Sequence, residues 1–326
     1  MYVQPSKENW SGRIDSHNDP LSFRFHQNVL IADLSNVQIN SNKSQTFGIL
    51  GYQCDAGVKR NQGRPGAAEA PDKIKQTLAK LSWHLPTNTD VFDMGNIKCE
   101  GDQLEEAQTK LGEAITFLFN KGVTPIILGG GHETFYGHYL GVREFIGPDA
   151  KLGIINIDAH FDMRPYDEKT SSGTMFKQIL DQDLHCHYLC AGIQRQGNTM
   201  SLFETAKQYQ VKYILEEDLS RLEINHALNE IDHFIEQHDY IILTLCTDVI
   251  NSAYAPGVSA PSPFGLDPKA VRTLIRHIVA KEKLLSFDIS EVNPAVDENN
   301  KTVVLAAQLI NEVLMNFHSY KNGGLK

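Results

Sequence analysis

Eight short apolar segments, separated by stretches with helical periodicity, constrain the fold of this chain more than any other feature. Each segment is a continuous apolar run rather than an alternation of apolar and polar residues. Continuous runs are typical of parallel strands that are covered on both faces, and strands that alternate with helices indicate an α/β fold. We therefore expect parallel strands at residues 46–52, 90–95, 124–130, 151–158, 187–193, 211–217, 240–246 and 283–289.

Between several of these segments apolar residues recur every three or four positions, as in a helix that packs one side on a sheet. About eight strand–helix units with short connections indicate one α/β domain with a parallel sheet. The spacing alone does not separate an open sheet from a closed (β/α)8 barrel. The clearest helical stripes are Leu104, Ala107, Leu111, Ile115 and Leu118; Leu228, Ile231 and Ile235; and Val303, Ala307, Ile310, Leu314 and Phe317.

The start of the chain differs from the rest. Residues 1–44 are polar, rich in Asn and Ser, and show neither strand nor helix periodicity. We expect them to form an irregular N-terminal arm that packs on the domain. Residues 45–326 are then a single catalytic domain, because α/β folds often form one domain of this length even though it would allow about two.

The charge balance and the cysteines limit the classes of partner. The chain carries 30 Lys and Arg against 40 Asp and Glu, a formal net charge of −10. An acidic protein is a poor ligand for nucleic acid or for an anionic membrane. No apolar stretch approaches the ~20 residues that span a bilayer, and the five cysteines are scattered and odd in number. We expect a cytoplasmic, reduced protein that binds a small-molecule substrate, with no nucleic-acid or membrane partner and with homo-oligomerisation left open.

The strongest local signal is the sequence NIDAHFD at residues 156–162, which ends an apolar run. Strand alternation puts Asp158 and His160 on one face, and Asp162 lies just beyond, where a loop begins. Burying two carboxylates and an imidazole beside isoleucines is costly unless they bind something. A single buried Asp is usually a helix cap or an arginine partner, but a pair of divalent metal ions accounts better for all three.

Three further strand ends carry polar residues of the same kind. His132 follows a glycine turn, Cys246 and Asp248 share a face at the end of another run, and Glu291 precedes Asn-Pro. Taken alone, each has a simpler interpretation as a turn residue, a loop cap or a surface ion pair. Together they extend the metal-site hypothesis, with Glu291 as a general base or as the partner of a cationic substrate group.

These segments together resemble the ureohydrolase superfamily, which includes arginase, agmatinase and formimidoylglutamase. The similarity runs from about residue 46 to residue 318 and includes GVKRNQGRPGAAEAPDKIK at 57–75. Within the superfamily the chain is most similar to the formimidoylglutamase branch, through WSGRID near the N-terminus, TSSGT at 170–174 and APGVSAP. The superfamily motifs occur here as GGGHE, DAHFD, TLCTDVINSAYAPG and EVNP.

The resemblance implies an arginase-like fold, a three-layer α/β/α sandwich around an eight-stranded, mostly parallel sheet. It places the site at the carboxyl ends of the strands, where ligands bind in doubly wound sheets. It also implies two Mn²⁺ ions per subunit, one of them possibly weak. His132 and Asp162 would bind one ion, His160 and Asp248 the other, and Asp158 would bridge the two.

The implied activity is that of a binuclear manganese hydrolase. It converts N-formimidoyl-L-glutamate and water to L-glutamate and formamide, a reaction of histidine degradation. By the same resemblance Asp162 is the proton carrier, and Glu291 holds the positively charged amidine. Both residues are therefore candidate catalytic residues.

Two positions depart from the arginase pattern. Cys246 replaces the first Asp of the Ser-x-Asp-x-Asp motif, and Phe176 aligns with a histidine of arginase. These departures make arginase activity itself improbable. We expect Cys246 to replace the missing carboxylate as a metal ligand, with Cys54 as a candidate disulfide partner under oxidation; the alternative is that Cys246 is an apolar filler pointing away from the metals.

The substrate charge separates the competing functions. Formimidoylglutamate carries two carboxylates, which the planar guanidinium of arginine matches. The loops offer Arg60, Arg64, Arg164 and Arg195, of which Arg164 is best placed, followed by Arg195 with help from Asn198. An agmatinase or guanidinobutyrase is one alternative function, and agmatine has no carboxylate. A catalytically weak relative that only binds metal or ligand is the other.

Overall fold

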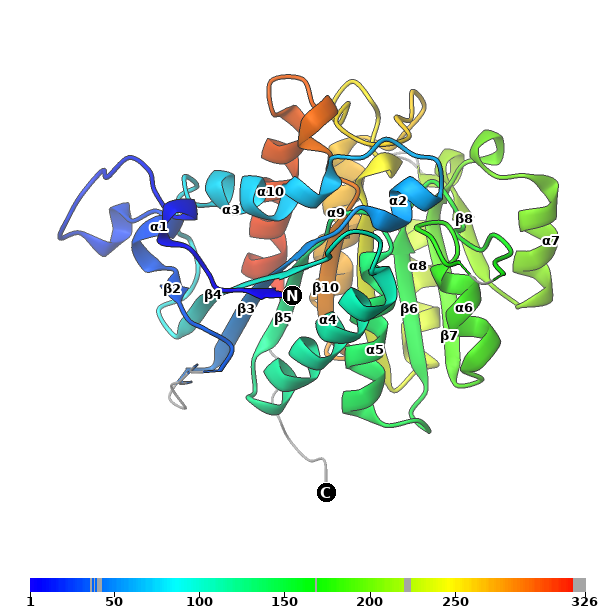
Figure 1. The fold of residues 1–326 in the computed structure, drawn as a ribbon, viewed down its shortest axis with the longest axis horizontal. Helices are drawn as coiled ribbons and strands as arrows, with labels where there is room; N and C mark the ends of the chain where they lie inside the picture. Colours follow the sequence, from blue (N-terminus) through cyan, green and yellow to red (C-terminus); the bar gives the residue numbers. More distant parts are fainter. Residues whose placement is uncertain (36, 38, 40–42, 168, 220–223, 319–326) are drawn as a thin grey trace.

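A computed structural model describes residues 1–326 except 36, 38, 40–42, 168, 220–223 and 319–326. In this described part a mostly parallel sheet is flanked by helices on both faces (Figure 1). All eight strands expected from the sequence are present. They are β3 (Gln45–Gln53), β4 (Thr89–Lys98), β5 (Thr124–Leu128), β6 (Leu152–Ile157), β7 (Cys186–Ile193), β8 (Lys212–Leu215), β9 (Tyr240–Cys246) and β10 (Leu284–Ser290).

The sheet is open, because its strand order has two ends: β1-β4-β3-β5-β10-β9-β6-β7-β8. Every neighbouring pair from β4 to β8 is parallel. The open order decides against a barrel and confirms the three-layer sandwich. Two strands of two residues each, β1 (Tyr2–Val3) and β2 (Leu30–Ile31), both pair with β4 and extend the sheet to ten strands.

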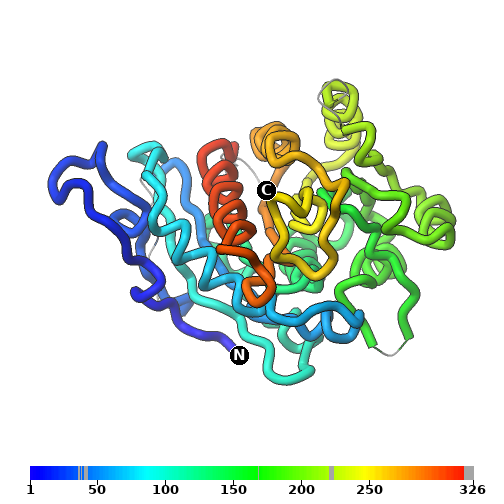
Figure 2. Tube along the Cα trace, turned by 90° about the horizontal axis from the view of Figure 1, so that it is seen from above, coloured from blue at the N-terminus to red at the C-terminus, as the bar shows by residue number. Residues whose placement is uncertain are grey.

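Two layers of helices cover the sheet. One face carries α3 (Ala70–Leu78), α8 (Ile224–Glu236), α9 (Pro268–Val279) and α10 (Lys301–Asn316), and Figure 2 shows α9 and α10 side by side. The other face carries α4 (Leu104–Asn120), α5 (Thr134–Ile146), α6 (Met175–Gln182) and α7 (Met200–Gln208). The helices α1 (Phe25–Asn28) and α2 (Ala56–Arg60) are short. Among the described helices, none combines the length and the apolar character needed to cross a membrane.

Each face of the sheet has its own apolar core, which explains the continuous apolar runs. In β6, Ile155 and Ile157 belong to the core beneath α9 and α10, whereas Leu152 and Ile154 belong to the core beneath α4 and α5. Successive residues of a strand point to opposite faces. A strand buried on both sides is therefore apolar at most of its positions.

The first residues of the chain are tied to β4 by specific contacts. The Tyr2 hydroxyl donates to the Met94 carbonyl at 3.0 Å, and the Trp10 ring nitrogen donates to Asp93 at 2.8 Å. These bonds hold the segment against the edge of the sheet. The division into an arm at 1–44 and a single domain at 45–326 stays a prediction.

Asp93, which accepts the hydrogen bond from Trp10, also belongs to a buried ion pair. Lys75 and Asp93 are both fully buried and lie 2.6 Å apart. The Lys75 ammonium also donates to the Gly95 carbonyl and to Asn96 Oδ1, both at 3.0 Å. All three hydrogens of the ammonium thus have acceptors, which a buried charge requires.

Replacing Lys75 by methionine should destabilise the protein strongly. The change leaves the Asp93 carboxylate buried without its counter-charge, and breaking such a pair typically costs about 3–5 kcal/mol. Urea denaturation measures the free energy of unfolding. The control is Lys110→Met, which removes an exposed pair with Glu106 on α4 and should change stability little; equal effects of the two variants would contradict the prediction.

Candidate metal centre

Four adjacent strands of the sheet bring the candidate residues together. The strands β5, β10, β9 and β6 are neighbours in that order and run parallel, so their carboxyl ends meet at one edge, at the top of Figure 1. His132 lies beyond β5, Glu291 follows β10, Cys246 ends β9 and Asp158 follows β6. Parallel topology therefore joins segments that lie far apart in the sequence.

Asp158 is the centre of the cluster and is fully buried. Its Oδ2 lies 3.1 Å from His132 Nδ1, and its Oδ1 lies 3.6 Å from His160 Nδ1. The same carboxylate accepts hydrogen bonds from the Asn156 side-chain amide at 3.0 Å and from the His160 backbone N–H at 2.8 Å. One oxygen of Asp158 thus faces each histidine, which is the arrangement that a bridging carboxylate needs.

Two further aspartates flank the histidines. Asp162 Oδ2 lies 2.9 Å from His132 Nδ1, and Asp248 Oδ2 lies 3.2 Å from His160 Nδ1. Asp248 Oδ1 is buried and has no hydrogen-bond partner among the described residues. Asp162 has a φ of 48°, a left-handed conformation that is uncommon outside glycine and that clusters at functional sites.

The ligand atoms form two groups that share Asp158. His132, Asp158 and Cys246 make one group, and Asp158, His160 and Asp248 make the other, each with all ligand atoms within 4.8 Å of one another. Imidazole nitrogens with carboxylate oxygens suit Mn²⁺. Together with the unpartnered oxygen of Asp248, this donor set fits a pair of divalent cations.

The Cys246 thiol faces the ligands of the first group rather than pointing away from them. It is buried, and burial together with the charge of Asp158 raises the pKa of the thiol well above its usual range. A thiolate would therefore form only in the field of a bound cation. Whether Cys246 binds metal stays a prediction.

Without a bound cation, the surroundings of the two histidines in this cluster favour their protonated forms. Burial opposes a charge on His132, but Asp158 and Asp162 outweigh it and raise the pKa of His132 well above its ordinary value. Burial is outweighed in the same way at His160, whose pKa is raised by Asp248 and Asp158. Both histidines in turn lower the pKa of Asp158, against the effect of its burial. A divalent cation would compete with these protons.

Two buried glutamates, Glu291 and Glu133, lie next to His132 of the cluster. Glu291 has a φ of 67°, and its Oε1 accepts the His132 backbone N–H at 2.9 Å. Burial raises the pKa of Glu291 to about 8, with Glu133 and Asp248 adding to the effect. Burial raises the pKa of Glu133 to about 7; its Oε1 accepts the Gly57 N–H at 2.8 Å, and its Oε2 is buried without a partner among the described residues.

The glycine turn before His132 is required by close packing. A Cβ atom on Gly130 would lie 1.8 Å from the Cys54 carbonyl oxygen, which no side chain allows. That oxygen accepts the Gly131 N–H at 2.9 Å. The turn thus docks against the end of β3 and carries His132 into the cluster.

A cavity of about 100 Å³ opens onto the cluster. Arg164 lines it, and its guanidinium makes no hydrogen bond or ion pair with the described residues. Asn61 and Ser172 also line it, and a Cβ atom on Gly173 would lie 3.1 Å from Asn61 Nδ2 and 3.2 Å from Arg164 Cδ. Neither polar residue was predicted as part of the site, although both lie in segments that carry the resemblance: Ser172 in TSSGT at 170–174 and Asn61 in GVKRNQGRPGAAEAPDKIK at 57–75. The cavity is lined by Val58, Asn61, Gly63, His132, His160, Asp162, Arg164, Ser172, Gly197, Asn198, Leu202, Cys246, Asp248, Ser259, Ala260 and Glu291.

The other arginines are engaged elsewhere or lie outside the cavity. Arg60 pairs with Asp102 and Glu105, and Arg64 donates to backbone carbonyls at residues 258 and 259. The side chain of Arg195 is 67% exposed, reaches Glu217 at 3.4 Å and does not line the cavity. Of the four arginines, Arg164 alone lines the cavity and has no side-chain partner among the described residues.

Asn198 lines the cavity, but its amide is occupied within the protein. Its Nδ2 donates to the carbonyls of Ala159 and Gln194 at 2.9 and 2.8 Å, and its Oδ1 accepts the Phe161 N–H at 3.0 Å. The side chain therefore joins the loop after β7 to the DAHFD segment. A direct bond to substrate stays a prediction.

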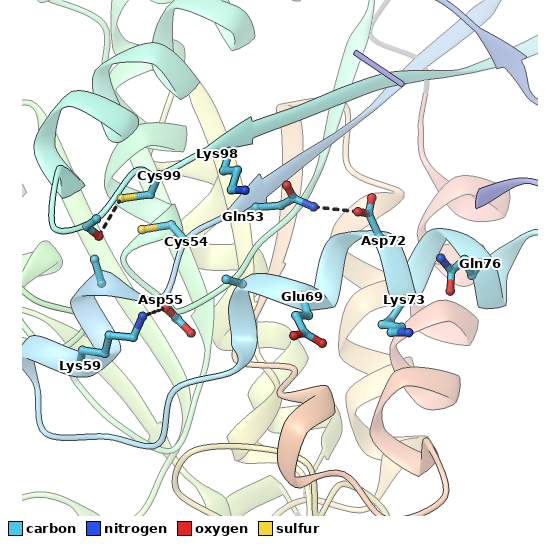
Figure 3. A pocket seen from close by; sticks show the side chains of 13 residues that line it. Gln53, Cys54, Asp55, Lys59, Glu69, Asp72, Lys73, Gln76, Lys98 and Cys99 are labelled. Carbon is cyan, nitrogen blue, oxygen red and sulfur yellow. Dashed lines mark hydrogen bonds and ion pairs between the residues drawn. The ribbon is translucent and has the colours of Figure 1, made fainter. Parts of the chain in front are cut away.

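Phe176 and Cys54 occupy different surroundings. Phe176 is buried, stacks on Tyr188 with ring centroids 4.2 Å apart, and lies 5.7 Å from the His132 ring. Cys54 lines a separate cavity of about 530 Å³ near the ends of β3 and β4, where Figure 3 shows its thiol beside Cys99. Cys99, rather than Cys246, is thus the neighbouring thiol of Cys54.

Comparisons with known proteins show the family of this chain. The arginase family model matches residues 45–316. A formimidoylglutamase of Geobacillus sp. (strain WCH70) is 56% identical over 318 residues, covering 98% of this chain and 97% of that protein. The crystal structure of formimidoylglutamase from Bacillus subtilis subsp. subtilis str. 168 has a TM-score of 0.80 at 20% identity, covering 92% and 93%. That of Trypanosoma cruzi formiminoglutamase with Mn²⁺ has a TM-score of 0.76 at 23% identity, covering 87% and 96%.

The chain therefore belongs to the arginase family. It is a hydrolase that acts on a linear amidine C–N bond of a small-molecule substrate. The two solved structures are less than 25% identical to it and support the fold alone.

The raised pKa of Glu291 predicts how the stability of the metal-free protein depends on pH. The folded state keeps a proton up to about pH 8 that the unfolded chain releases near 4.5. The contribution of Glu291 to the free energy of unfolding is thus greatest below the lower value and is lost as pH rises through the higher one, by at most about 1.4 kcal/mol per pH unit. Thermal denaturation of chelator-treated protein across this pH range measures how the free energy of unfolding changes with pH. This change should be smaller for Glu291→Gln than for wild type. It should be the same as in wild type for Glu113→Gln, which alters an exposed glutamate of α4. Equal slopes for wild type and Glu291→Gln would refute the assignment.

Proposed function

We propose that this protein hydrolyses N-formimidoyl-L-glutamate to L-glutamate and formamide with two Mn²⁺ ions per subunit, as a step in histidine degradation. The observation that carries the proposal is the pair of ligand groups sharing Asp158, with the unpaired Arg164 at the same cavity. The 56% identity to a formimidoylglutamase over nearly the full chain supports the substrate. The Mn²⁺ in the Trypanosoma cruzi structure supports the metal.

We assign each metal ligand by its place in the cluster. His132 and Asp162 hold one ion, His160 and Asp248 the other, and Asp158 bridges them, in keeping with its two oxygens that face the two histidines. When bound, the two ions would lower the pKa of a water at the site and supply a nucleophile at neutral pH.

The two candidate catalytic residues act on the substrate's nitrogen atoms. Asp162 lines the cavity with a side chain 15% exposed, so it can carry a proton to the nitrogen of glutamate as the bond from that nitrogen to the formimidoyl carbon breaks. Glu291 lines the same cavity and is buried. An amidinium cation beside it favours its ionised form and would pair with it.

Arginines bind the two carboxylates of the substrate in this proposal. Arg164 pairs with one of them, because its guanidinium is free and lies at the cavity. Arg195 reaches the second by leaving Glu217, since an ion pair between two exposed side chains is worth little. Asn198 supports Arg195 by holding the loop that carries it.

We also propose that the protein works in the reducing cytoplasm, with homo-oligomerisation left open. All five cysteines are free, in keeping with such a compartment. The arm at 1–44 and the single domain at 45–326 remain part of the same proposal.

A product assay tests the proposed function. Metal-stripped protein is reconstituted with Mn²⁺ and offered formimidoylglutamate, agmatine, guanidinobutyrate and arginine, and formamide, urea and ammonia are measured. Formamide from formimidoylglutamate alone is the expected result. Urea from agmatine or guanidinobutyrate would assign the chain to the agmatinase type, and the absence of any product would leave a metal-binding relative without this activity.

Replacing Arg164 by alanine should raise KM for formimidoylglutamate by about ten- to a hundredfold, because a hydrogen bond to a charged group is worth about 1.5–3 kcal/mol. Arg164→Lys should recover only part of the loss, since the forked geometry is absent. Steady-state kinetics measure both variants, with the exposed Arg13→Ala as control. An unchanged KM for Arg164→Ala would move the role to another residue.

Replacing Cys246 by aspartate should tighten Mn²⁺ binding by about tenfold or more, because a carboxylate offers hard oxygens and a thiol must first lose a proton. Calorimetric titration with Mn²⁺ under reducing conditions measures the dissociation constant. Cys99→Asp, in the separate cavity, adds the same charge away from the ligands and should bind Mn²⁺ as wild type does. Equal affinity in wild type and Cys246→Asp, together with wild-type activity that peroxide leaves intact, would mean that Cys246 is an apolar filler.

A further inference from the structure

A strip of buried polar residues interrupts the apolar core beside α5. In β9, Leu243 and Leu245 face the core under α9 and α10, so Thr244 between them faces the opposite core. In β10, Asp288 lies between Phe287 and Ile289 of the first core and faces the α5 side in the same way. Polar groups at such positions are costly unless they bond one another.

Asp288 is the acceptor on which this strip converges, and it is completely buried. Its Oδ2 lies 2.7 Å from His138 Nδ1 of α5, and its Oδ1 accepts the Thr244 hydroxyl at 2.8 Å and the Ser290 hydroxyl at 3.2 Å. His138 Nε2 lies 2.6 Å from the Ser286 hydroxyl, so both nitrogens of its ring are engaged. The carboxylate is thus fully satisfied and held in one orientation.

The strip reaches the candidate metal centre through Thr244. Thr244 Oγ1 lies 3.1 Å from His132 Nε2 as well as 2.8 Å from Asp288. A hydroxyl has a single hydrogen, and an ionised carboxylate can only accept. Because Thr244 donates its hydrogen to Asp288, its oxygen accepts from His132, and the proton of that bond sits on His132 Nε2.

This proton fixes which nitrogen of His132 is available. With Nε2 protonated, the lone pair of a neutral imidazole is on Nδ1, the atom that faces Asp158 at 3.1 Å and Asp162 at 2.9 Å. The nitrogen of a histidine that binds metal is set by the hydrogen bond that the other nitrogen makes.

We propose that Asp288, held by His138, is a positioning residue of the metal centre: acting through Thr244, it keeps the proton of His132 on Nε2 and leaves Nδ1 free to bind the metal ion. The inference rests on the manganese site of the proposed function. It concerns residues outside the ligand set, and it assigns a purpose to the aspartate of SFDISEVNP.

Metal affinity of the stripped protein tests this inference, with free Mn²⁺ followed by its electron paramagnetic resonance signal. Thr244→Val is isosteric and removes the hydroxyl, and Asp288→Asn keeps the shape and removes the charge. Each should raise the Mn²⁺ dissociation constant by about ten- to a hundredfold, the usual loss for an outer-shell partner. Thr244→Ser should restore most of the affinity that Thr244→Val loses. Thr116→Val, which deletes hydroxyl bonds between α4 and α5 away from the site, is the matched control.

A double variant separates positioning from general loosening of the core. If Asp288 acts through Thr244, the variant with both changes binds Mn²⁺ no more weakly than Thr244→Val alone, because residues on one path are not additive. Losses that multiply, or a dissociation constant unchanged in Thr244→Val, would overturn the inference. Formimidoylglutamate hydrolysis by wild type tests the proposed function separately. If wild type is active and Thr244→Val binds Mn²⁺ as tightly as wild type, only this inference is rejected. If wild type is inactive and Thr244→Val binds Mn²⁺ more weakly, only the proposed substrate is rejected.

Discussion

The burial of the Asp158 carboxylate is the constraint on which the rest of the site depends. A buried charge is tolerated only when it is paired and hydrogen-bonded, and here His132, His160 and Asn156 supply those partners. The partners come from NIDAHFD at 156–162 and from the glycine turn after β5, so the parallel sheet must bring the ends of β5 and β6 to one edge.

Most of the fold could be predicted because both faces of the sheet are buried. A strand such as β6 is apolar at most positions on both faces, and eight such runs stand out from the amphipathic helices between them. The strands β1 and β2 could not be predicted, because two residues carry no periodicity and pair only through the geometry of β4. The choice between open sheet and barrel also required the strand order, which depends on contacts between distant segments.

The candidate site was predictable where residue type and strand end coincide. His132 and Asp158 each follow an apolar run, and the sheet brings them together. Residues that contribute from loops were harder to predict. Asn61 lies in the segment 57–75, where nothing in the sequence shows which side chains face the cavity, and Arg195 precedes the cavity residue Gly197 yet pairs with Glu217. Thr244 could not be predicted as part of the site, because the role of a lone polar residue in an apolar strand depends on its partner on the neighbouring strand.

Anomalous diffraction at the manganese edge, from crystals grown with Mn²⁺, tests the central claim most directly. The account predicts two peaks about 3.5–4 Å apart. One lies beside His132 Nδ1, the other beside His160 Nδ1, and Asp158 lies between them. Two peaks in this arrangement would establish the shared carboxylate as the bridge. A peak elsewhere, or no peak at this edge of the sheet, would contradict the assignment of the strand-end cluster as the metal centre.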